Sequence, residues 1–236
     1  MIILSITFFI LILCLLLLFF RKKKCFGSFS EQASDVVIFD FDGTLCDSFK
    51  DVFISFNALS ARYKFNPILL TRVEELRGLP SREIFRHLKI SAYKLPWIVR
   101  DIRKIMSSKI SSMELFEGMG EALKDLKSRG VVLGVLTSNS SINVHKFLSQ
   151  NDIEYFDFVI SSDSIFGKDR ALKKIKRSLS CNKVFYVGDE TRDIIAAKKS
   201  GVTAVAVSWG YNNSNILQRA KPHYILNKPS ELQNLL

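Results

Sequence analysis

Five short apolar runs, rich in valine and isoleucine, recur along the chain between stretches with helical periodicity. Most of them are apolar on consecutive residues rather than on alternate ones, which is typical of strands buried on both faces of a parallel sheet. Strands are predicted over residues 36–40, 131–136, 158–161, 184–187 and 204–207. Helices are predicted between them over residues 120–128, 142–150, 168–179 and 191–200. This alternation predicts a doubly wound α/β fold with a parallel sheet.

The interval between the first two predicted strands breaks the alternation. It is about ninety residues long, and helices are predicted in it over residues 48–63, 67–76, 81–88 and 95–108. So much helix after a single strand predicts an inserted helical domain, residues 49–113, in a core domain of residues 35–48 and 114–236. The insert begins and ends near the carboxyl end of the first strand, where open α/β sheets bind ligands. We therefore expect it to cover the site as a cap.

A long apolar segment opens the sequence. Residues 2–20 contain no charge, and the basic run R-K-K-K follows at residues 21–24. A helix of that length spans about 28 Å, close to the thickness of a bilayer's hydrocarbon core. A cleavable signal peptide would begin with basic residues and end in a small-residue cleavage site, both of which are missing here. We expect a single-pass transmembrane anchor (residues 1–24) and a linker (residues 25–34), with the catalytic domain on the cytoplasmic side.

The chain has a net charge of +11. Such an excess is compatible with nucleic-acid binding or with a basic surface near anionic lipid and anionic substrates. No nucleic-acid-binding motif accompanies the charge, so we expect no nucleic-acid partner. The cysteines show no zinc-binding spacing: Cys14, Cys25, Cys46 and Cys181. The oligomeric state is left open by the sequence.

The first predicted strand ends in the sequence D-F-D-G-T-L, residues 40–45. Asp40 and Asp42 are two residues apart on an extended chain, so their side chains are expected to point the same way. Two carboxylates that close repel each other and require a cation. Gly43 allows the backbone to turn sharply after them. Taken alone, the motif is equally compatible with an ordinary turn.

Three further polar motifs follow, each at the end of a predicted strand or at the start of the next helix. The sequence T-S-N at residues 137–139 places a hydroxyl and backbone amides at a helix N-terminus, which suits anion binding, although the serine or asparagine could simply be an N-cap. Lys168 opens a helix, and Asp189 and Asp193 flank another; singly they could be a solvated lysine and helix-dipole partners. Because parallel strands end at one edge of a sheet, the four motifs are expected to converge.

The four motifs, in this order, resemble those of the haloacid dehalogenase superfamily. The resemblance covers about residues 35–236 and is greatest to phosphoglycolate phosphatase-like members. It implies a parallel sheet with strand order 5-4-1-2-3, a site at the carboxyl ends of the strands, Mg²⁺ as cofactor and a small phosphorylated substrate.

The resemblance also implies a role for each catalytic residue. Asp40 would be the nucleophile and a ligand of Mg²⁺. Asp42 would be the general acid–base, with its backbone carbonyl on the metal. Lys168 would offset the charge of Asp40 and phosphate, and Asp189 would complete the metal site. Asp193 would lie behind them and orient Lys168 or metal-bound water.

A second set of residues would bind the substrate. The phosphoryl group would be held by residues from the first two motifs: Gly43, Thr137, Ser138 and Asn139. The segment L-R-G-L-P-S-R-E, residues 76–83, resembles the substrate loop of such caps. Arg77 or Arg82 could therefore reach the far end of the substrate, although either could be a solvated surface residue.

Individual residues of the motifs indicate which reactions of the superfamily this chain is expected to catalyse. Members that cleave carbon–halogen bonds lack the acid found here at Asp42, and the ion-pumping ATPases have a lysine where Phe41 stands. Phosphomutases of the β-phosphoglucomutase type usually have a Glu–Asp pair where this chain has Gly188 and Asp189. These positions favour a phosphatase that acts on a small phosphate monoester. A phosphomutase, or a membrane-bound module that binds a phosphorylated ligand without turnover, are the alternatives.

Overall fold

A computed structural model describes residues 34–79, 81–162, 167–179 and 181–236. Its centre is a six-stranded parallel sheet in the order β3-β2-β1-β4-β5-β6. The strands are β1 (Ser34–Phe39), β2 (Val132–Thr137), β3 (Phe158–Ser161), β4 (Cys181–Gly188), β5 (Thr203–Val207) and β6 (Tyr224–Leu226). The predicted α/β fold and the order of its five strands are confirmed. Strand β6 was not predicted, because a run of three residues is too short to show a periodicity.

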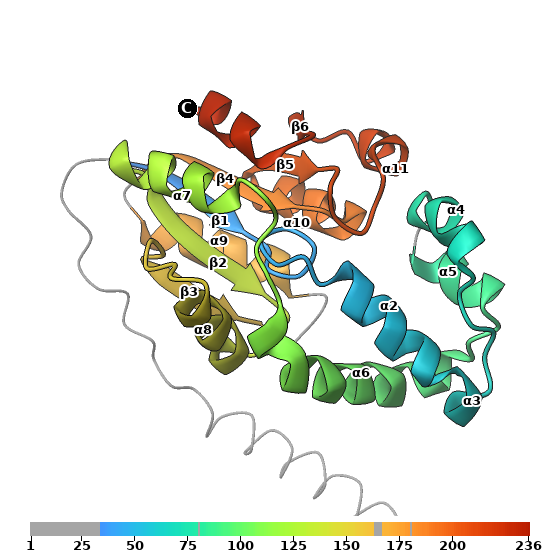
Figure 1. The fold of residues 1–236 in the computed structure, drawn as a ribbon. Helices are drawn as coiled ribbons and strands as arrows, with labels where there is room; N and C mark the ends of the chain where they lie inside the picture. Colours follow the sequence, from blue (N-terminus) through green and yellow to red (C-terminus); the bar gives the residue numbers. More distant parts are fainter. Residues whose placement is uncertain (1–33, 80, 163–166, 180) are drawn as a thin grey trace, which may run out of the picture. The chain divides into compact units, whose positions relative to one another are not determined.

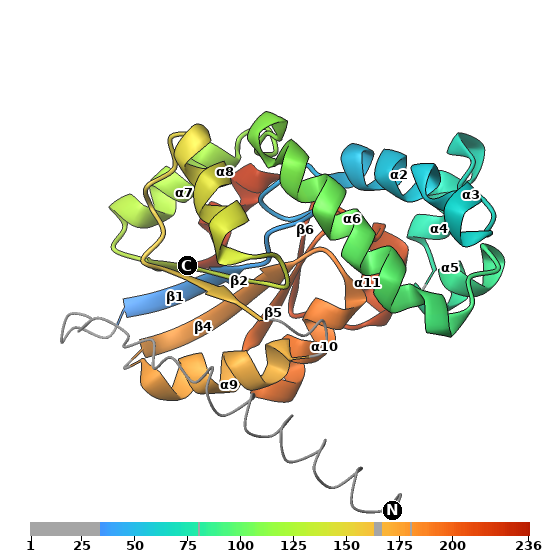
Figure 2. The same ribbon diagram turned by 90° about the horizontal axis from the view of Figure 1, so that it is seen from below.

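Helices cover both faces of the sheet (Figure 2). On one face lie α7 (Met119–Ser128) and α8 (Ser141–Gln150), and on the other lie α9 (Lys168–Ser178) and α10 (Thr191–Ser200). This covering explains the consecutive apolar residues of the strands, because both faces of β1 are removed from water from Val36 to Phe39. After β5 come two elements absent from the sequence analysis, α11 (Ser214–Arg219) and the 3₁₀ helix η4 (Pro229–Leu235), which packs against α7.

The segment between β1 and α7 is helical. It contains α2 (Phe49–Ala58), α3 (Ser60–Tyr63), α4 (Val73–Arg77), α5 (Ser81–His87) and α6 (Leu95–Lys109). Figure 1 shows these helices on the side of the sheet where β1 ends. They enclose a hydrophobic cluster of their own, formed by Leu59, Phe65, Leu76, Leu88, Ile90 and Ile98. The inserted helices are therefore stabilised largely by contacts among themselves.

The helix predicted over residues 67–76 does not begin at Pro67. The Asn57 side chain donates to the carbonyl of Ile68 (2.9 Å) and accepts from its N–H group (2.8 Å). Both backbone groups of Ile68 are therefore paired outside a helix, and the chain becomes α-helical at Val73 instead. Such a side-chain contact has no signature in the local sequence pattern.

The predicted membrane anchor, residues 1–24, lies outside the described residues, as does almost all of the predicted linker. Within the described part of the chain, no helix is long and apolar enough to cross a membrane. The longest of these helices, α6, has 15 residues and several charges, and it would span only about 22 Å. This finding contradicts the predicted single-pass membrane location with a cytoplasmic catalytic domain, and we do not retain that prediction.

Substitution of Phe147 on α8 tests the packing of the hydrophobic core. Its side chain is fully buried, and its ring meets that of Phe41 edge to face, with the ring centroids 5.0 Å apart. We expect Phe147→Ala to lower the free energy of unfolding by about 3–5 kcal/mol, measured by urea denaturation, because it leaves a cavity beside Phe41. The control is Ile142→Ala on the same helix, where the side chain is 77% exposed and the expected change is within about 0.5 kcal/mol. Equal losses in both variants would contradict this packing.

Candidate active site

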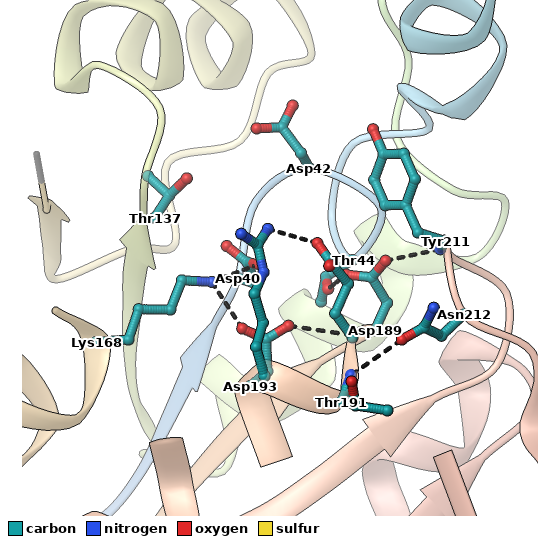
Figure 3. Close-up of polar contacts among 12 residues, drawn as sticks. Asp40, Asp42, Thr44, Thr137, Lys168, Asp189, Thr191, Asp193, Tyr211 and Asn212 are labelled. Carbon is teal, nitrogen blue, oxygen red and sulfur yellow. Dashed lines mark hydrogen bonds and ion pairs between the residues drawn. The ribbon is translucent and has the colours of Figure 1, made fainter. Parts of the chain in front are cut away.

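The carboxyl edge of the sheet brings together side chains from four separate segments (Figure 3). Asp40 follows β1, Thr137 ends β2, Lys168 begins α9 and Asp189 follows β4. All four side chains are buried. The parallel register places the ends of β1, β2 and β4 side by side, since Phe39 pairs with both Val135 and Val187. The predicted convergence of the four motifs is therefore present.

A buried lysine bridges two of the carboxylates. The Nζ atom of Lys168 lies 2.6 Å from Asp40 Oδ2 and 2.8 Å from Asp193 Oδ1. Burial favours the neutral amine, but the negative charges of Asp193 and Asp40 outweigh it and raise the pKa of Lys168 well above its ordinary value. Lys168 is therefore a fixed positive charge beside Asp40.

Asp193 is held by the start of α10. Its Oδ2 atom accepts from the backbone N–H of Glu190 (3.1 Å), and the two residues form a reciprocal capping box. Its other oxygen accepts from Lys168. The contact on which the predicted orienting role of Asp193 depends is therefore present.

Three buried carboxylates form the one group in the described part of the chain that could hold a metal ion. Oxygens of Asp40, Asp189 and Asp193 all lie within 4.8 Å of one another. Burial raises the pKa of Asp40 to about 7, against the opposing effect of Lys168, and burial with neighbouring acids raises the pKa of Asp189 well above its ordinary value. A compact set of hard oxygen ligands with excess negative charge suits Mg²⁺, so the residues fit the expected cofactor.

Two residues that the sequence analysis did not assign hold Asp189 in place. The Thr44 hydroxyl donates to Asp189 Oδ1 (2.8 Å), and the Tyr211 backbone N–H donates to Oδ2 (2.7 Å). Tyr211 belongs to the loop after β5, and the Trp209 indole of the same loop donates to the carbonyl of Thr44 (3.1 Å). Thr44 stands next to Gly43 in the first motif, so its position in D-F-D-G-T-L was the available signal.

Gly43 is needed for close approach rather than only for a turn. Its φ is +75°, and a Cβ atom there would lie 2.3 Å from Asp189 Oδ2 and 2.4 Å from Tyr211 Cδ2. No side chain can be accommodated without displacing Asp189. Its predicted contact with phosphate stays a prediction.

Asp42 lies apart from the carboxylate group, as Figure 3 shows. Strand β1 ends at Phe39, and the N–H groups of Thr44, Leu45 and Cys46 turn back to the carbonyl of Phe41. The backbone therefore turns within this motif, and the expectation that Asp40 and Asp42 point the same way stays a prediction. The half-buried Asp42 accepts from Asn139 Nδ2 (3.1 Å). Burial raises the pKa of Asp42, and the bond from Asn139 opposes this.

The residues after β2 form a loop with local hydrogen bonds. The backbone N–H of Asn139 donates to Thr137 Oγ1 (2.9 Å). The N-cap of α8 is Ser140, whose hydroxyl accepts from Asn143 N–H (3.2 Å), so the alternative of an N-cap at Ser138 or Asn139 is wrong. Thr137, Ser138 and Asn139 are thereby left in the loop at the sheet edge, where their predicted role in binding phosphate is retained as a proposal.

Arg77 is engaged by the loop after β5. Its guanidinium donates to the carbonyls of Gly210 (2.7 Å), Tyr211 (3.3 Å) and Ser208 (3.4 Å), and it pairs with Glu74 (2.7 Å). Arg77 thus fixes α4 to the loop after β5, and its expected contact with the substrate stays a prediction. The side chain of Arg82 lies outside the described residues.

Comparisons with known proteins agree with this geometry. The sequence model of the family described as haloacid dehalogenase-like hydrolase matches residues 37–207. A phosphoglycolate phosphatase of Synechococcus elongatus is 36% identical over 199 residues, which are 83% of this chain and 94% of the relative. A pyrophosphatase, PpaX, of Bacillus mycoides is 26% identical, over 86% of this chain and 96% of its own. A solved haloacid dehalogenase-like family protein of Streptococcus pneumoniae shares the fold, with a TM-score of 0.70, 22% identity and coverage of 86% and 97%.

A pair of glycines tests the close packing on Asp189. Gly43 and Gly118 have nearly the same φ, +75° and +78°, but a Cβ at Gly118 would meet nothing within 4 Å. Gly118→Ala should therefore show only the left-handed strain, about 1–2 kcal/mol in the free energy of unfolding. We expect Gly43→Ala to lose at least twice as much and to weaken Mg²⁺ binding, measured by urea denaturation and titration calorimetry. Equal losses and equal Mg²⁺ affinities would contradict the packing.

The raised pKa of Asp40 predicts a pH dependence in the metal-free protein. Between the unfolded pKa of 3.8 and the folded pKa of about 7, the folded state keeps a proton that the unfolded chain releases. The free energy of unfolding in EDTA should therefore fall as pH rises through this window, by at most about 1.4 kcal/mol per pH unit for this group.

Urea denaturation at pH 4.5, 5.5, 6.5 and 7.5 measures this slope, and Asp40→Asn should reduce it. Asp101→Asn is the control, because hydrogen bonds from Tyr63 and Arg100 lower the pKa of Asp101, so that it titrates below the window. A slope in Asp40→Asn as steep as in the parent protein would show that Asp40 is not the titrating group.

Proposed function

The chain belongs to the haloacid dehalogenase-like hydrolases and is a phosphatase of that family, and we propose that it hydrolyses a small phosphate monoester with Mg²⁺ through an aspartyl-phosphate intermediate. The observation that carries this proposal is the buried ion pair of Asp40 with Lys168 beside Asp189 at the sheet edge. Lys168 favours the ionised form of Asp40 against the effect of burial and holds one of its oxygens in place, as a nucleophile requires.

In the first half of the reaction, an oxygen of Asp40 forms a bond to phosphorus while the bond from phosphorus to the leaving oxygen breaks. Asp42 gives its proton to that oxygen. The raised pKa of Asp42 supports this role, because the carboxyl then keeps a proton closer to neutral pH. Lys168 and the amides near Thr137 would stabilise the charge on the transferred group.

In the second half, a water molecule attacks the phosphorus of the aspartyl-phosphate. Asp42, now ionised, takes a proton from this water, and the bond between phosphorus and Asp40 breaks. Phosphate and the original carboxylate result, so atoms and charge balance. The bond from Asn139 holds Asp42 in place for both proton transfers.

Asp40, Asp189 and the backbone carbonyl of Asp42 are the groups we propose to hold Mg²⁺. The ion would neutralise the negative charge of phosphate, so that an anionic nucleophile can approach it. Asp193 completes the group of three carboxylates, and it binds both Lys168 and the backbone N–H of Glu190. We assign Asp193 to orienting Lys168, because its Oδ1 atom accepts from the ammonium group that also pairs with Asp40.

A phosphomutase is the second candidate, and Gly188 argues against it. A Cβ atom at Gly188 would lie 2.5 Å from Asp193 Cβ and 2.7 Å from its Cγ. The glutamate expected at this position in a mutase has no room while Asp193 pairs with Lys168. A binding module without turnover is also disfavoured, because no catalytic carboxylate of the four motifs is replaced.

The relative from Synechococcus elongatus makes 2-phosphoglycolate the reference substrate to test, in line with the phosphoglycolate-like ester expected from the sequence. The inserted helices, residues 49–113, would act as the cap that contacts the leaving group. Arg82 is the remaining candidate for a contact of the cap with the substrate.

Asp40→Asn tests the reaction. We expect this change to lower Mg²⁺-dependent phosphate release from small esters by at least about 10³-fold, because an amide cannot form the intermediate, while substrate binding measured by calorimetry is retained. Asp47→Asn, at an exposed carboxylate in the same loop, should leave the rate unchanged. Hydrolysis at the parent rate in Asp40→Asn would refute the covalent mechanism.

A further inference from the structure

A cavity of about 240 Å³ lies between the inserted helices and the core. Its walls come from α2, from α4 and α5, which lie across from α2 (Figure 1), and from core residues Glu190, Tyr211 and Asn212. These core residues flank the metal-binding carboxylate, since Glu190 follows Asp189 directly and Tyr211 N–H binds it. The cavity therefore lies beside Asp189, on the side of the inserted helices.

The walls of this cavity are strongly apolar. Four phenylalanine side chains line it, Phe49, Phe53, Phe56 and Phe85, together with aliphatic side chains. Apolar walls with a few polar groups at one end are typical of sites that bind an apolar ligand in a fixed orientation. Here the polar end is the end nearest Asp189.

The described walls offer no free cation to an anionic ligand. Arg77 is the one basic side chain among them, and its guanidinium is already bonded to Glu74 and to three backbone carbonyls. Glu190 adds a negative charge at the polar end, and it pairs with Arg192. A carboxylate on the leaving group would lose water there without gaining an unpaired cation among the described side chains of the walls.

We infer that the preferred substrate has an apolar leaving group of about the size of one aromatic ring, which this cavity accepts. The inference rests on the proposed phosphatase function and defines the substrate class more narrowly. The volume is sufficient, because an apolar cavity of about 150 Å³ in another protein holds benzene. The short carboxylate-bearing chain of 2-phosphoglycolate would fill little of this space.

Three phosphate esters of primary alcohols distinguish a preference for an aromatic leaving group from a preference for a charged one: ethyl phosphate, 2-phosphoglycolate and benzyl phosphate. Ethyl phosphate resembles 2-phosphoglycolate in size but lacks its charge, and benzyl phosphate adds the ring. For the full chain with Mg²⁺, we expect kcat/KM for benzyl phosphate to exceed that for ethyl phosphate by at least about tenfold, since even one methylene in a fitted pocket changes it by that much. 2-Phosphoglycolate should be no better than ethyl phosphate.

Two variants test whether the cavity causes this preference. Val73→Trp fills the cavity, and Phe53→Asn makes the wall of the cavity polar. Both residues line the cavity. Neither belongs to the hydrophobic cluster of the core or to that of the insert. Each should lower the benzyl-to-ethyl ratio of kcat/KM about tenfold. Leu70→Trp is the matched control, since Leu70 is 78% exposed and lies outside the cavity. It should leave the ratio unchanged.

A preference for 2-phosphoglycolate over both other esters would overturn the inference while leaving the phosphatase function intact. A benzyl-to-ethyl ratio that both cavity variants leave unchanged would also overturn it. Failure to release phosphate from any of the three esters would overturn the proposed function itself, and the inference with it.

Discussion

The interaction on which the site depends is the burial of Lys168 between Asp40 and Asp193. Removing ions from water costs several kcal/mol each, so a buried charge must be paired and hydrogen-bonded. Here one ammonium group faces three carboxylates within the described site, because Asp189 lies beside the pair. The lysine neutralises only part of this charge. Burial, and after it the neighbouring acidic groups, raise the pKa values of Asp40 and Asp189. The remaining negative charge is what a divalent cation can neutralise, so the same imbalance that weakens the metal-free fold favours binding of the cofactor.

The parallel sheet supplies the geometry for this charge cluster. Its strands end at one edge, and the turn after each strand carries a polar residue into the same small volume. Strands β1, β2 and β4 were predictable from their consecutive apolar residues. The positions of Asp40, Thr137 and Asp189 at the ends of these strands were therefore predictable as well. Lys168 and Asp193 stand at predicted helix starts, and their roles were expected from the resemblance of the four motifs to the haloacid dehalogenase superfamily. Local pattern and topology thus account for the residues that meet at the sheet edge.

The contacts that orient those residues were not predictable in the same way. Thr44 and Asp189 are 145 residues apart, and Tyr211 reaches Asp189 from another loop. Neither contact leaves a periodicity, because each depends on the tertiary approach of two loops. The same holds for Asn57, which redirects the chain at Ile68 through its side chain alone. Sequence reasoning therefore identified the chemical groups, but not the contacts that orient them.

The loop after β5 connects the site to the insert, because it contacts both the group of carboxylates and the inserted helices. Gly210 packs so closely on Gly43 and Asp189 that a Cβ atom there would lie 2.2 Å from the Gly43 carbonyl and 2.4 Å from Asp189 Cβ. Tyr211 N–H fixes Asp189, while Arg77 of α4 holds the carbonyls of the same two loop residues. A shift of α4 would therefore pull on the peptide groups that orient Asp189. The apolar cavity lies between these helices and this loop. The walls that would contact a leaving group and the carboxylate that would bind the metal are therefore both held by hydrogen bonds to the backbone of this loop.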